Sequence, residues 1–259
     1  MIKVHRTPTA PAIQSGGMAA VPLGRRVYAV GDVHGCADLL EPMLDAIAED
    51  VARRPVETPI EVFIGDYIDR GLESAQVIDL LARPGPPGSR RVCLLGNHEA
   101  VLMTCMADGA ALRSWRSMGA METLQSYGIE PKVLRPGANA EEFRQAAMER
   151  IPLEHWTFLQ SLLPFFSVGG LFFCHAGVRP GISLGQQSRR DLLWIRDEFL
   201  QSSMDFGRVV IHGHTPVRDV SFRANRINID TGAYATGVLS CVILGAETTE
   251  VLTISKTAQ

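Results

Sequence analysis

The sequence lacks any apolar run near the roughly 18 residues that a membrane-spanning helix requires. Its first 24 residues lack the charged-then-apolar order of a secretory signal. A formal net charge of −3 leaves no excess of positive charge for binding nucleic-acid polymers or acidic membranes. These absences favour a cytoplasmic protein whose partners are neither membranes nor nucleic acids, and they specify no oligomeric state.

Cysteine is scarce and has no pairing pattern. The five cysteines are odd in number and none of them is in C-x-x-C spacing, so neither a disulfide framework nor a thiolate zinc site is indicated. Cys93 and Cys174 lie in apolar, strand-like runs and are expected to be small buried hydrophobes. This usage favours a reducing compartment.

The length and composition are those of one large globular domain. The chain has 259 residues, of which 46% are hydrophobic and 20% are charged. Residues 1–24 are rich in Pro, Ala, Ser and Gly and are predicted to form a flexible tail. The domain is therefore placed at residues 25–259, with an insertion inside it.

A strand, a polar loop and a helix recur three times, at intervals of about 30 residues. The expected pairs are strand 25–30 with helix 37–53, strand 59–64 with helix 73–83, and strand 91–95 with helix 100–107. This alternation is typical of βαβ units, so the fold class is α/β with a parallel sheet.

The second half of the chain changes character twice. Residues 108–163 contain helix-like segments broken by Gly and Pro, and are predicted to be a helical insertion over the sheet edge. Residues 165–174 read as a hairpin and residues 208–211 as a strand. Three later strands, near residues 226–230, 237–244 and 250–254, indicate a second sheet.

Residues 65–71, Gly-Asp-Tyr-Ile-Asp-Arg-Gly, follow the second strand and form the most informative stretch. Parallel sheets place their ligands at the carboxyl ends of their strands. Asp66, Asp69 and Arg70 are too polar for a core, and the flanking glycines permit a tight turn. By itself the stretch fits a solvated turn with a local Asp–Arg pair equally well.

Other strand-end loops decide between these interpretations. Five of the seven histidines fall in them. The polar residues after the strands are Asp32, His34, Asp66, Asn97, His98, His175 and His214. Carboxylates, imidazoles and an amide oxygen suit Mn, Fe or Zn. Asp66 is central in the set and could bridge two ions, as two-metal hydrolytic sites require.

The motifs resemble those of the phosphoprotein phosphatase superfamily of calcineurin-like metallophosphoesterases. The matching stretches are residues 31–35 (GDVHG), 65–71, 96–99 (GNHE), His175, and residues 213–214. The resemblance extends from about residue 27 to residue 244 and is strongest to the bacterial branch that includes the bacteriophage lambda protein phosphatase. That branch shares the longer forms GDxHGC, GHTP and IDTGA, which occur here in residues 31–36, 213–216 and 229–233.

The resemblance implies an αββα sandwich, in which two central mixed sheets are flanked by helices, and a dinuclear centre. By the family pattern Asp32 and His34 would hold one divalent cation, Asp66 would bridge, and Asn97, His175 and His214 would hold the second. Manganese is the metal expected in vitro, with Fe or Zn as alternatives.

The same pattern implies the groups that act on the substrate. His98 would protonate the leaving oxygen and Asp69 would orient it. Arg70, Asn97 and Arg196 would bind the phosphate.

Other polar and aromatic residues near the motifs have plainer interpretations. Arg196 rests on the short match Trp194-x-Arg196, and the alternative is a surface arginine. His212 is predicted to support neighbouring ligands or to be structural, and Asp230 is predicted to form a turn. Aromatic residues expected to pack rather than react are Tyr67, Trp115, Trp156 and Trp194.

The predicted activity is metal-dependent hydrolysis of phosphoesters, with phosphoserine or phosphothreonine in proteins or peptides as the first choice of substrate. The alternative is a nucleotide pyrophosphohydrolase of the diadenosine tetraphosphatase type. Asp69 and Glu99 favour the protein-phosphatase reading, since that alternative type often lacks the former and commonly has Asp for the latter. A third hypothesis is a non-catalytic metal-binding scaffold, against which the complete set of motif residues argues.

Overall fold

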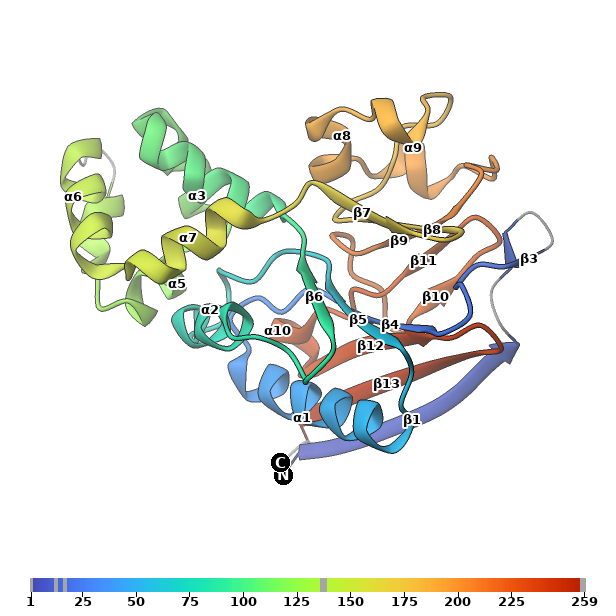
Figure 1. Ribbon diagram of the computed structural model, residues 1–259. Helices are drawn as coiled ribbons and strands as arrows, with labels where there is room; N and C mark the ends of the chain where they lie inside the picture. The colour runs from blue at the N-terminus through green and yellow to red at the C-terminus, as the bar shows by residue number, and fades with distance from the viewer. Residues whose placement is uncertain (1, 12–13, 16–17, 136–138, 257–259) are drawn as a thin grey trace.

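The computed structural model describes residues 2–11, 14–15, 18–135 and 139–256. Two β-sheets pack face to face and helices cover both outer faces (Figure 1). This confirms the predicted α/β sandwich of two mixed sheets flanked by helices. In the described part of the chain, no helix is both long enough and apolar enough to cross a membrane.

The first sheet has six strands in the order β1-β13-β12-β4-β5-β6. Its parallel half contains the strands of the βαβ units, and its antiparallel half contains the chain ends. The strand bounds are β1 Ile2–Pro11, β4 Arg25–Val30, β5 Thr58–Phe63, β6 Arg90–Cys93, β12 Val238–Leu244 and β13 Thr248–Lys256.

The second sheet has five strands in the order β10-β11-β9-β8-β7. Strands β8, β9 and β11 are parallel, and β7 and β10 are antiparallel edges. The bounds are β7 Phe165–Val168, β8 Leu171–Cys174, β9 Val209–His212, β10 Ser221–Phe222 and β11 Arg226–Asn228, and a separate pair consists of β2 Gln14–Ser15 and β3 Met18–Ala19. The late strands were all predicted in this sheet, but β12 and β13 belong to the first because β12 pairs antiparallel with β4.

The two-residue periodicity of each strand explains the layers. Val27 and Ala29 of β4 point into the core between the sheets, whereas Tyr28 and Val30 face the helices on the other side. The same alternation in the second sheet sends Phe173 into the core between the sheets and its neighbours to the outer face. Each sheet is therefore buried on both faces.

Helices lie on the outer face of each sheet (Figure 1). Helices α1 Ala37–Arg53 and α2 Ser74–Ala82 cover the first sheet, and α8 Arg189–Trp194 and α9 Asp197–Leu200 lie on the second. The region predicted as an insertion contains η1 Gly109–Ala111, α4 Leu112–Arg116, α5 Ala120–Ser126, η2 Pro131–Leu134, α6 Ala140–Arg150 and α7 Leu153–Ser161. The remaining helices are α3 Asn97–Ala107, η3 Leu184–Gln186 and α10 Ala233–Thr236.

Residues 2–11 differ from the flexible tail that we expected. They form β1, which runs antiparallel to β13 at the edge of the first sheet. Arg6 ties this strand to the domain, because its guanidinium donates to Asp50 Oδ1 at 2.7 Å. Asp50 also accepts from Arg54, at 2.8 and 2.9 Å, and from the hydroxyl of Tyr28 at 2.7 Å.

This carboxylate network predicts an acid-sensitive contribution to stability. Burial by itself raises the pKa of Asp50, but hydrogen bonds from Arg54, Tyr28 and Arg6 outweigh it and lower the pKa to about 2. A carboxyl whose pKa is depressed by folding stabilises the protein above its unfolded pKa, and this is lost as the pH falls through the folded value. Asp50→Asn is expected to cost about 2 kcal/mol of unfolding free energy at pH 7.

Urea unfolding of the wild type and Asp50→Asn at several pH values tests this expectation. The difference in unfolding free energy should be constant above about pH 5 and should narrow as the pH approaches 2. Glu49→Gln, on the exposed face of the same helix, is the matched control and should change little. A gap between wild type and Asp50→Asn that is unchanged down to pH 2 would refute the proposed ionic network.

Candidate metal centre

The polar residues predicted from the strand-end loops meet at one edge of the two sheets. Asp32 and His34 follow β4, Asp66 follows β5, and His175 and His214 follow β8 and β9. Asn97 and His98 were expected in a loop but lie in the first turn of α3. That helix begins early because Glu99 accepts the backbone N–H of its N-cap, Gly96, at 3.1 Å. All seven side chains are buried.

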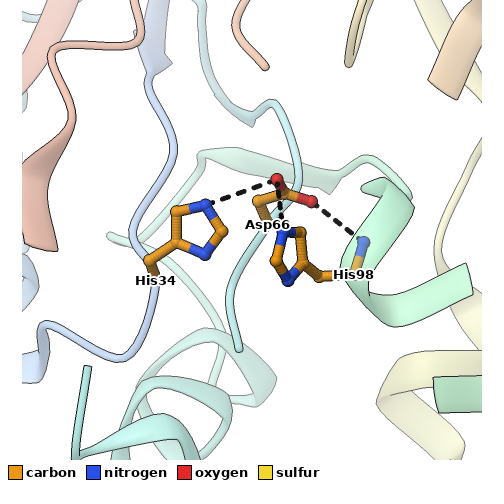
Figure 2. Close-up of side chains that lie close together, drawn as sticks. All are labelled: His34, Asp66 and His98. Carbon is orange, nitrogen blue, oxygen red and sulfur yellow. Dashed lines mark hydrogen bonds and ion pairs between the residues drawn. The ribbon is translucent and has the colours of Figure 1, made fainter. Parts of the chain in front are cut away.

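Asp66 lies at the centre of the cluster. Its Oδ2 is 3.4 Å from His34 Nε2, 3.7 Å from His98 Nε2 and 3.3 Å from His175 Nε2. Figure 2 shows His34 and His98 approaching this carboxylate from two sides, while the backbone N–H of His98 donates to Oδ1 at 3.2 Å. One carboxylate thus faces several imidazoles at once.

A second group of ligand atoms adjoins the first. Asn97 Oδ1 is 2.9 Å from His175 Nε2 and 3.0 Å from His214 Nδ1. Ligand atoms of Asp66, His175 and His214 all lie within 4.8 Å of one another, as do those of His34, Asp66 and His98. Two adjacent groups that share Asp66 are the arrangement a bridged pair of cations requires.

Asp32 supplies an independent test of the fit to a cation. Its Oδ2 accepts the backbone N–H of His214 at 3.1 Å, but its Oδ1 is buried with no hydrogen-bond partner among the described residues. A buried carboxylate oxygen without a donor is costly, and a cation would satisfy it. Gly213 completes this arrangement, since a Cβ at that position would collide with Asp32 Oδ1. The donor set therefore fits divalent cations.

The protonation states agree with this fit. Burial lowers the pKa of His34 to about 3 and that of His214 to about 2, so both imidazoles are neutral and keep a free lone pair. Although burial alone raises the pKa of Asp66, the surrounding histidines, led by His175, hold it well below its ordinary value. Burial lowers the pKa of His175, but Asp66 reverses this and raises it to about 9. A cation at Asp66 would displace that proton.

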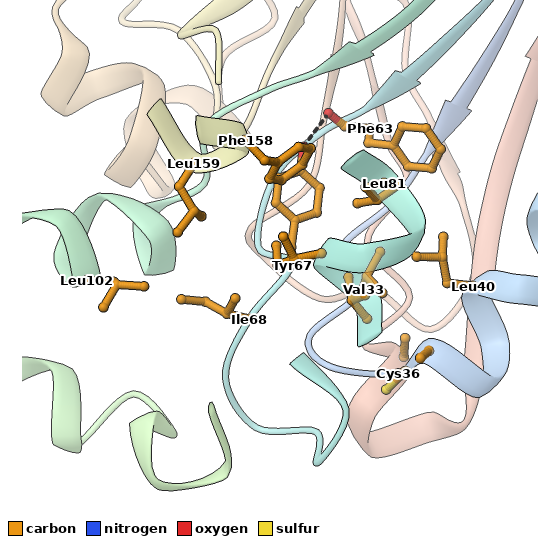
Figure 3. Packing of buried hydrophobic residues seen from close by; sticks show 14 of the residues in the cluster. Val33, Cys36, Leu40, Phe63, Tyr67, Ile68, Leu81, Leu102, Phe158 and Leu159 are labelled. Atoms are coloured by element: carbon orange, nitrogen blue, oxygen red, sulfur yellow. Dashed lines mark hydrogen bonds between the residues drawn. The ribbon is translucent and has the colours of Figure 1, made fainter. Parts of the chain in front are cut away.

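The loop that carries Asp66 is fixed from behind by Glu99. Its carboxylate accepts backbone N–H groups of Asp66 at 3.0 Å, Tyr67 at 2.7 Å and Ile68 at 3.1 Å. Tyr67 fills the apolar cluster under the loop, with its hydroxyl 3.1 Å from the carbonyl of Phe63 (Figure 3). The same hydroxyl donates to the carbonyl of Leu94 at 2.7 Å. Glu99 thus shapes the loop from a fully buried position.

Asp69 and His98 form the pair that the family pattern implies. His98 Nδ1 is 2.7 Å from Asp69 Oδ2. Trp115 Nε1 donates to the same Oδ2 at 2.9 Å, and the hydroxyl of Thr123 donates to Oδ1 at 2.5 Å. Trp115 was expected to be a packing residue; it is buried, and it also orients Asp69. Helices α4 and α5 therefore reach the centre directly.

Two arginines border the centre, one beside His98 and the other beside Thr215. Arg70 Nη2 is 3.5 Å from His98 Nε2, and its guanidinium lies 4.6 Å from the ring centroid of Tyr234. Arg196 is exposed and donates to the hydroxyl of Thr215, the residue after His214, at 3.0 Å. Tyr234 carries no motif signal, and only the fold reveals its position under Arg70.

The backbone is unusual at five non-glycine residues of the centre. Positive φ values occur at His34 (45°), Asp66 (54°), Asp69 (71°), Arg70 (71°) and His214 (65°). Non-glycine residues rarely adopt this left-handed conformation, which costs roughly 1–2 kcal/mol per residue. The described chain has no other non-glycine residue with positive φ. Such local concentration marks a functional site.

His212 and Asp230 take the structural positions that were predicted for them. The ring of His212 packs edge-on against Phe199 at 4.9 Å, and its Nδ1 faces the carbonyl of Gly213 at 3.2 Å. Asp230 Oδ1 accepts the N–H of Gly232 at 2.8 Å and so closes a turn.

Comparison with known proteins identifies the family of this chain. A family model described as calcineurin-like phosphoesterase matches residues 25–240. The chain belongs to the calcineurin-like phosphoesterase family. It is 26% identical over 240 residues to an asymmetrical bis(5'-nucleosyl)-tetraphosphatase of Halalkalibacterium halodurans, a match that covers 82% of this chain and 87% of the relative.

This calcineurin-like phosphoesterase is also similar to a protein phosphatase and to a solved structure. It is 27% identical over 231 residues to serine/threonine-protein phosphatase 2 of Salmonella typhimurium, covering 84% of this chain and 92% of the relative. The crystal structure of a putative diadenosine tetraphosphatase superposes with a TM-score of 0.62 at 20% identity, over 90% of this chain and 95% of that one. The structural likeness establishes the shared fold.

Proposed function

We propose that this metallophosphoesterase hydrolyses dinucleoside polyphosphates of the bis(5'-nucleosyl) tetraphosphate class. The observation that carries the proposal is the similarity to the Halalkalibacterium enzyme, which extends over 82% of this chain and 87% of the relative. This reverses the order of the two substrates expected from the sequence, where a phosphoprotein came first.

The geometry explains why the sequence cues for a protein phosphatase do not discriminate. Those cues were Asp69 and Glu99, and both side chains are fully buried. Glu99 bonds to the backbone of the Asp66 loop, and Asp69 lies behind His98. Neither faces the space where a phosphoester would bind, so both residues would serve a dinucleotide and a phosphopeptide equally.

The metal roles that we propose follow the family pattern. Asp32 and His34 would hold one cation, Asp66 would contribute to both sites, and Asn97, His175 and His214 would hold the second. The ligand atoms of His98 also lie close to those of His34 and Asp66, and we assign His98 to proton transfer. Manganese is the proposed metal in vitro, with Fe or Zn as alternatives. Two bound divalent cations would lower the pKa of a water molecule and offset the charge of the phosphate.

The remaining roles belong to the groups around the cations. His98 donates a proton from Nε2 to the leaving oxygen, since its Nδ1 is held by Asp69. Arg70 and Arg196 bind phosphate oxygens, with Asn97 as a further contact, and offset the charge that develops in the transition state.

Hydrolysis of phosphoserine and phosphothreonine in proteins is the second candidate function. Its support is the similarity to the Salmonella protein phosphatase, at 27% identity over 231 residues. Both candidates use the same cations, acid and arginines, and they differ only in what lies beyond the phosphate.

A single experiment tests the proposal in two stages. Metals are stripped and Mn, Zn, Fe or Mg is added back singly while para-nitrophenyl phosphate hydrolysis is measured. We expect a transition metal, Mn first, to restore activity. Hydrolysis of diadenosine tetraphosphate and of a phosphothreonine peptide is then compared, and a preference for the peptide would establish the second candidate instead. No hydrolysis of any substrate with any metal would leave a non-catalytic scaffold.

The contact between Trp115 and Asp69 predicts a change in leaving-group dependence. Trp115→Phe removes one charge-assisted hydrogen bond to the buried carboxylate and loosens the orientation of His98. We expect a roughly tenfold fall in kcat for phenyl phosphate, a poor leaving group, and little change for 2,4-dinitrophenyl phosphate, which needs no acid. Trp156→Phe, a buried indole outside the site, is the matched control. Equal losses with both esters would assign Trp115 a purely structural role.

A further inference from the structure

Trp194, which was expected to pack rather than to react, is 43% exposed at the end of helix α8. Its ring stands edge-on to the imidazole of His214, with centroids 6.2 Å apart and an interplanar angle of 81°. The other side of the indole is therefore available at the rim of the candidate metal centre. Exposed aromatic rings beside a phosphate-binding centre are surfaces on which a nucleobase can stack.

A cavity of about 560 Å³ opens beside this indole. Its volume is within the range of about 300–1,000 Å³ that small-molecule sites occupy. Residues lining it include Arg179, Ser188, Arg190, Trp194, Arg196 and Asp197. Arg196 also donates to Thr215 next to His214, so the cavity and the metal centre share a wall.

The charges in the cavity suit the phosphate and ribose of a nucleotide. Arg179 is neutralised by Asp191 at 2.6 Å and Glu198 at 2.7 Å. Arg190 lies near enough to Asp191 to lower the pKa of that carboxyl, but among the described residues it makes no ion pair within 4 Å. Arg190 and Arg196 are therefore the two guanidinium groups that can bind anionic oxygens. The exposed carboxylate of Asp197 is a suitable acceptor for ribose hydroxyls.

We propose that this cavity is a nucleoside subsite, in which one base of the substrate stacks on Trp194 and the phosphate chain passes Arg196 to reach the metal centre. The inference rests on the proposed dinucleotide hydrolase function and adds the group that recognises the nucleoside. Trp194 then contributes to nucleotide affinity and has no role in cleaving a phosphate that carries no base.

A binding measurement with ligands that cannot be hydrolysed tests the nucleoside subsite independently of catalysis. The affinity of metal-loaded protein for the phosphonate analogue of AMP, which cannot be hydrolysed, is compared by calorimetry with its affinity for methylphosphonate. The nucleoside should improve the Kd by about tenfold or more, as one stacked base does. Trp194→Ala should abolish this advantage and leave methylphosphonate binding unchanged, while Trp194→Phe should retain most of it.

The binding experiment has its own control variant, and the results that would overturn the subsite differ from those that would overturn the proposed function. Phe222→Ala, which removes an exposed aromatic ring on β10, should change neither affinity. Equal binding of the two phosphonates to the wild type, or an advantage that survives in Trp194→Ala, would overturn the subsite. Weakened binding of both ligands by Trp194→Ala would identify it as a support for His214 and also overturn the subsite.

Kinetics extend the test to the proposed substrate. With diadenosine tetraphosphate, Trp194→Ala should raise KM about tenfold or more and leave kcat nearly unchanged. With para-nitrophenyl phosphate both parameters should be unchanged. A wild type that does not cleave the dinucleotide would refute the proposed function, whereas a dinucleotide KM that is unaffected in Trp194→Ala would refute only the subsite.

Discussion

Asp66→Asn is expected to reduce turnover by about 10³-fold or more, equivalent to about 4 kcal/mol of transition-state stabilisation. Asp66 is the one residue shared by both groups of ligand atoms, so loss of its charge weakens both cation sites at once. The domain should remain folded for two reasons. Asparagine tolerates the left-handed backbone at this position, where φ is 54°. Its amide oxygen can also still accept the N–H of His98.

Three measurements on purified Asp66→Asn test whether the residue serves catalysis or the fold: kcat for para-nitrophenyl phosphate, metal content, and the free energy of unfolding. Asp219→Asn, which alters an exposed carboxylate, is the matched control and should match the wild type in all three. Parallel loss of activity and unfolding free energy in Asp66→Asn would show that the residue maintains the fold.

His98→Asn is expected to slow hydrolysis of poor-leaving-group esters by about 10²- to 10⁴-fold while both cations stay bound. The His98 imidazole is held by Asp69 at 2.7 Å, and its Nε2 lies between Asp66 and Arg70, at 3.7 and 3.5 Å. This position suits a proton donor to a leaving oxygen. It is also close enough to Asp66 for a metal ligand, so the metal content of the variant is the deciding measurement.

Two equivalents of metal in His98→Asn, combined with a slow rate, would support the acid. Loss of one equivalent would make His98 a ligand and contradict the proposed role. His155→Asn is the matched control, since this histidine is also buried and bonded to a carboxylate, Asp79, but lies in the helical insertion away from the cations.

The meeting of the candidate metal ligands at one edge of the sheets could be predicted because each part of the cluster is local in sequence. A strand followed by a short polar loop fixes where Asp32 or Asp66 must point, and parallel strands then bring their carboxyl ends to one edge. The boundaries of strand β4 and helix α1 were predicted to the residue for a similar reason, since a six-residue strand and an amphipathic helix carry their own periodicity.

What the sequence did not reveal depends on contacts between distant segments. Trp115 and Thr123 reach Asp69 across 46 and 54 residues of chain, from helices without a motif. The strand β1 was missed because its partner, β13, lies at the other end of the chain. The cue for a protein substrate does not discriminate, because the residue pattern does not show that Glu99 bonds to the backbone of the Asp66 loop.

The left-handed residues have a consequence for how this protein can change. His34, Asp66, Asp69, Arg70 and His214 hold conformations that the two sheets must stabilise at a cost of several kcal/mol in total. A variant selected only for thermal stability gains by relaxing these positions, for instance to glycine, and loses the proposed metal ligands and Arg70 in doing so. Substitutions that raise stability are therefore expected to be tolerated in the helices and outer strands. They are not expected to be tolerated in the loops that carry these five residues.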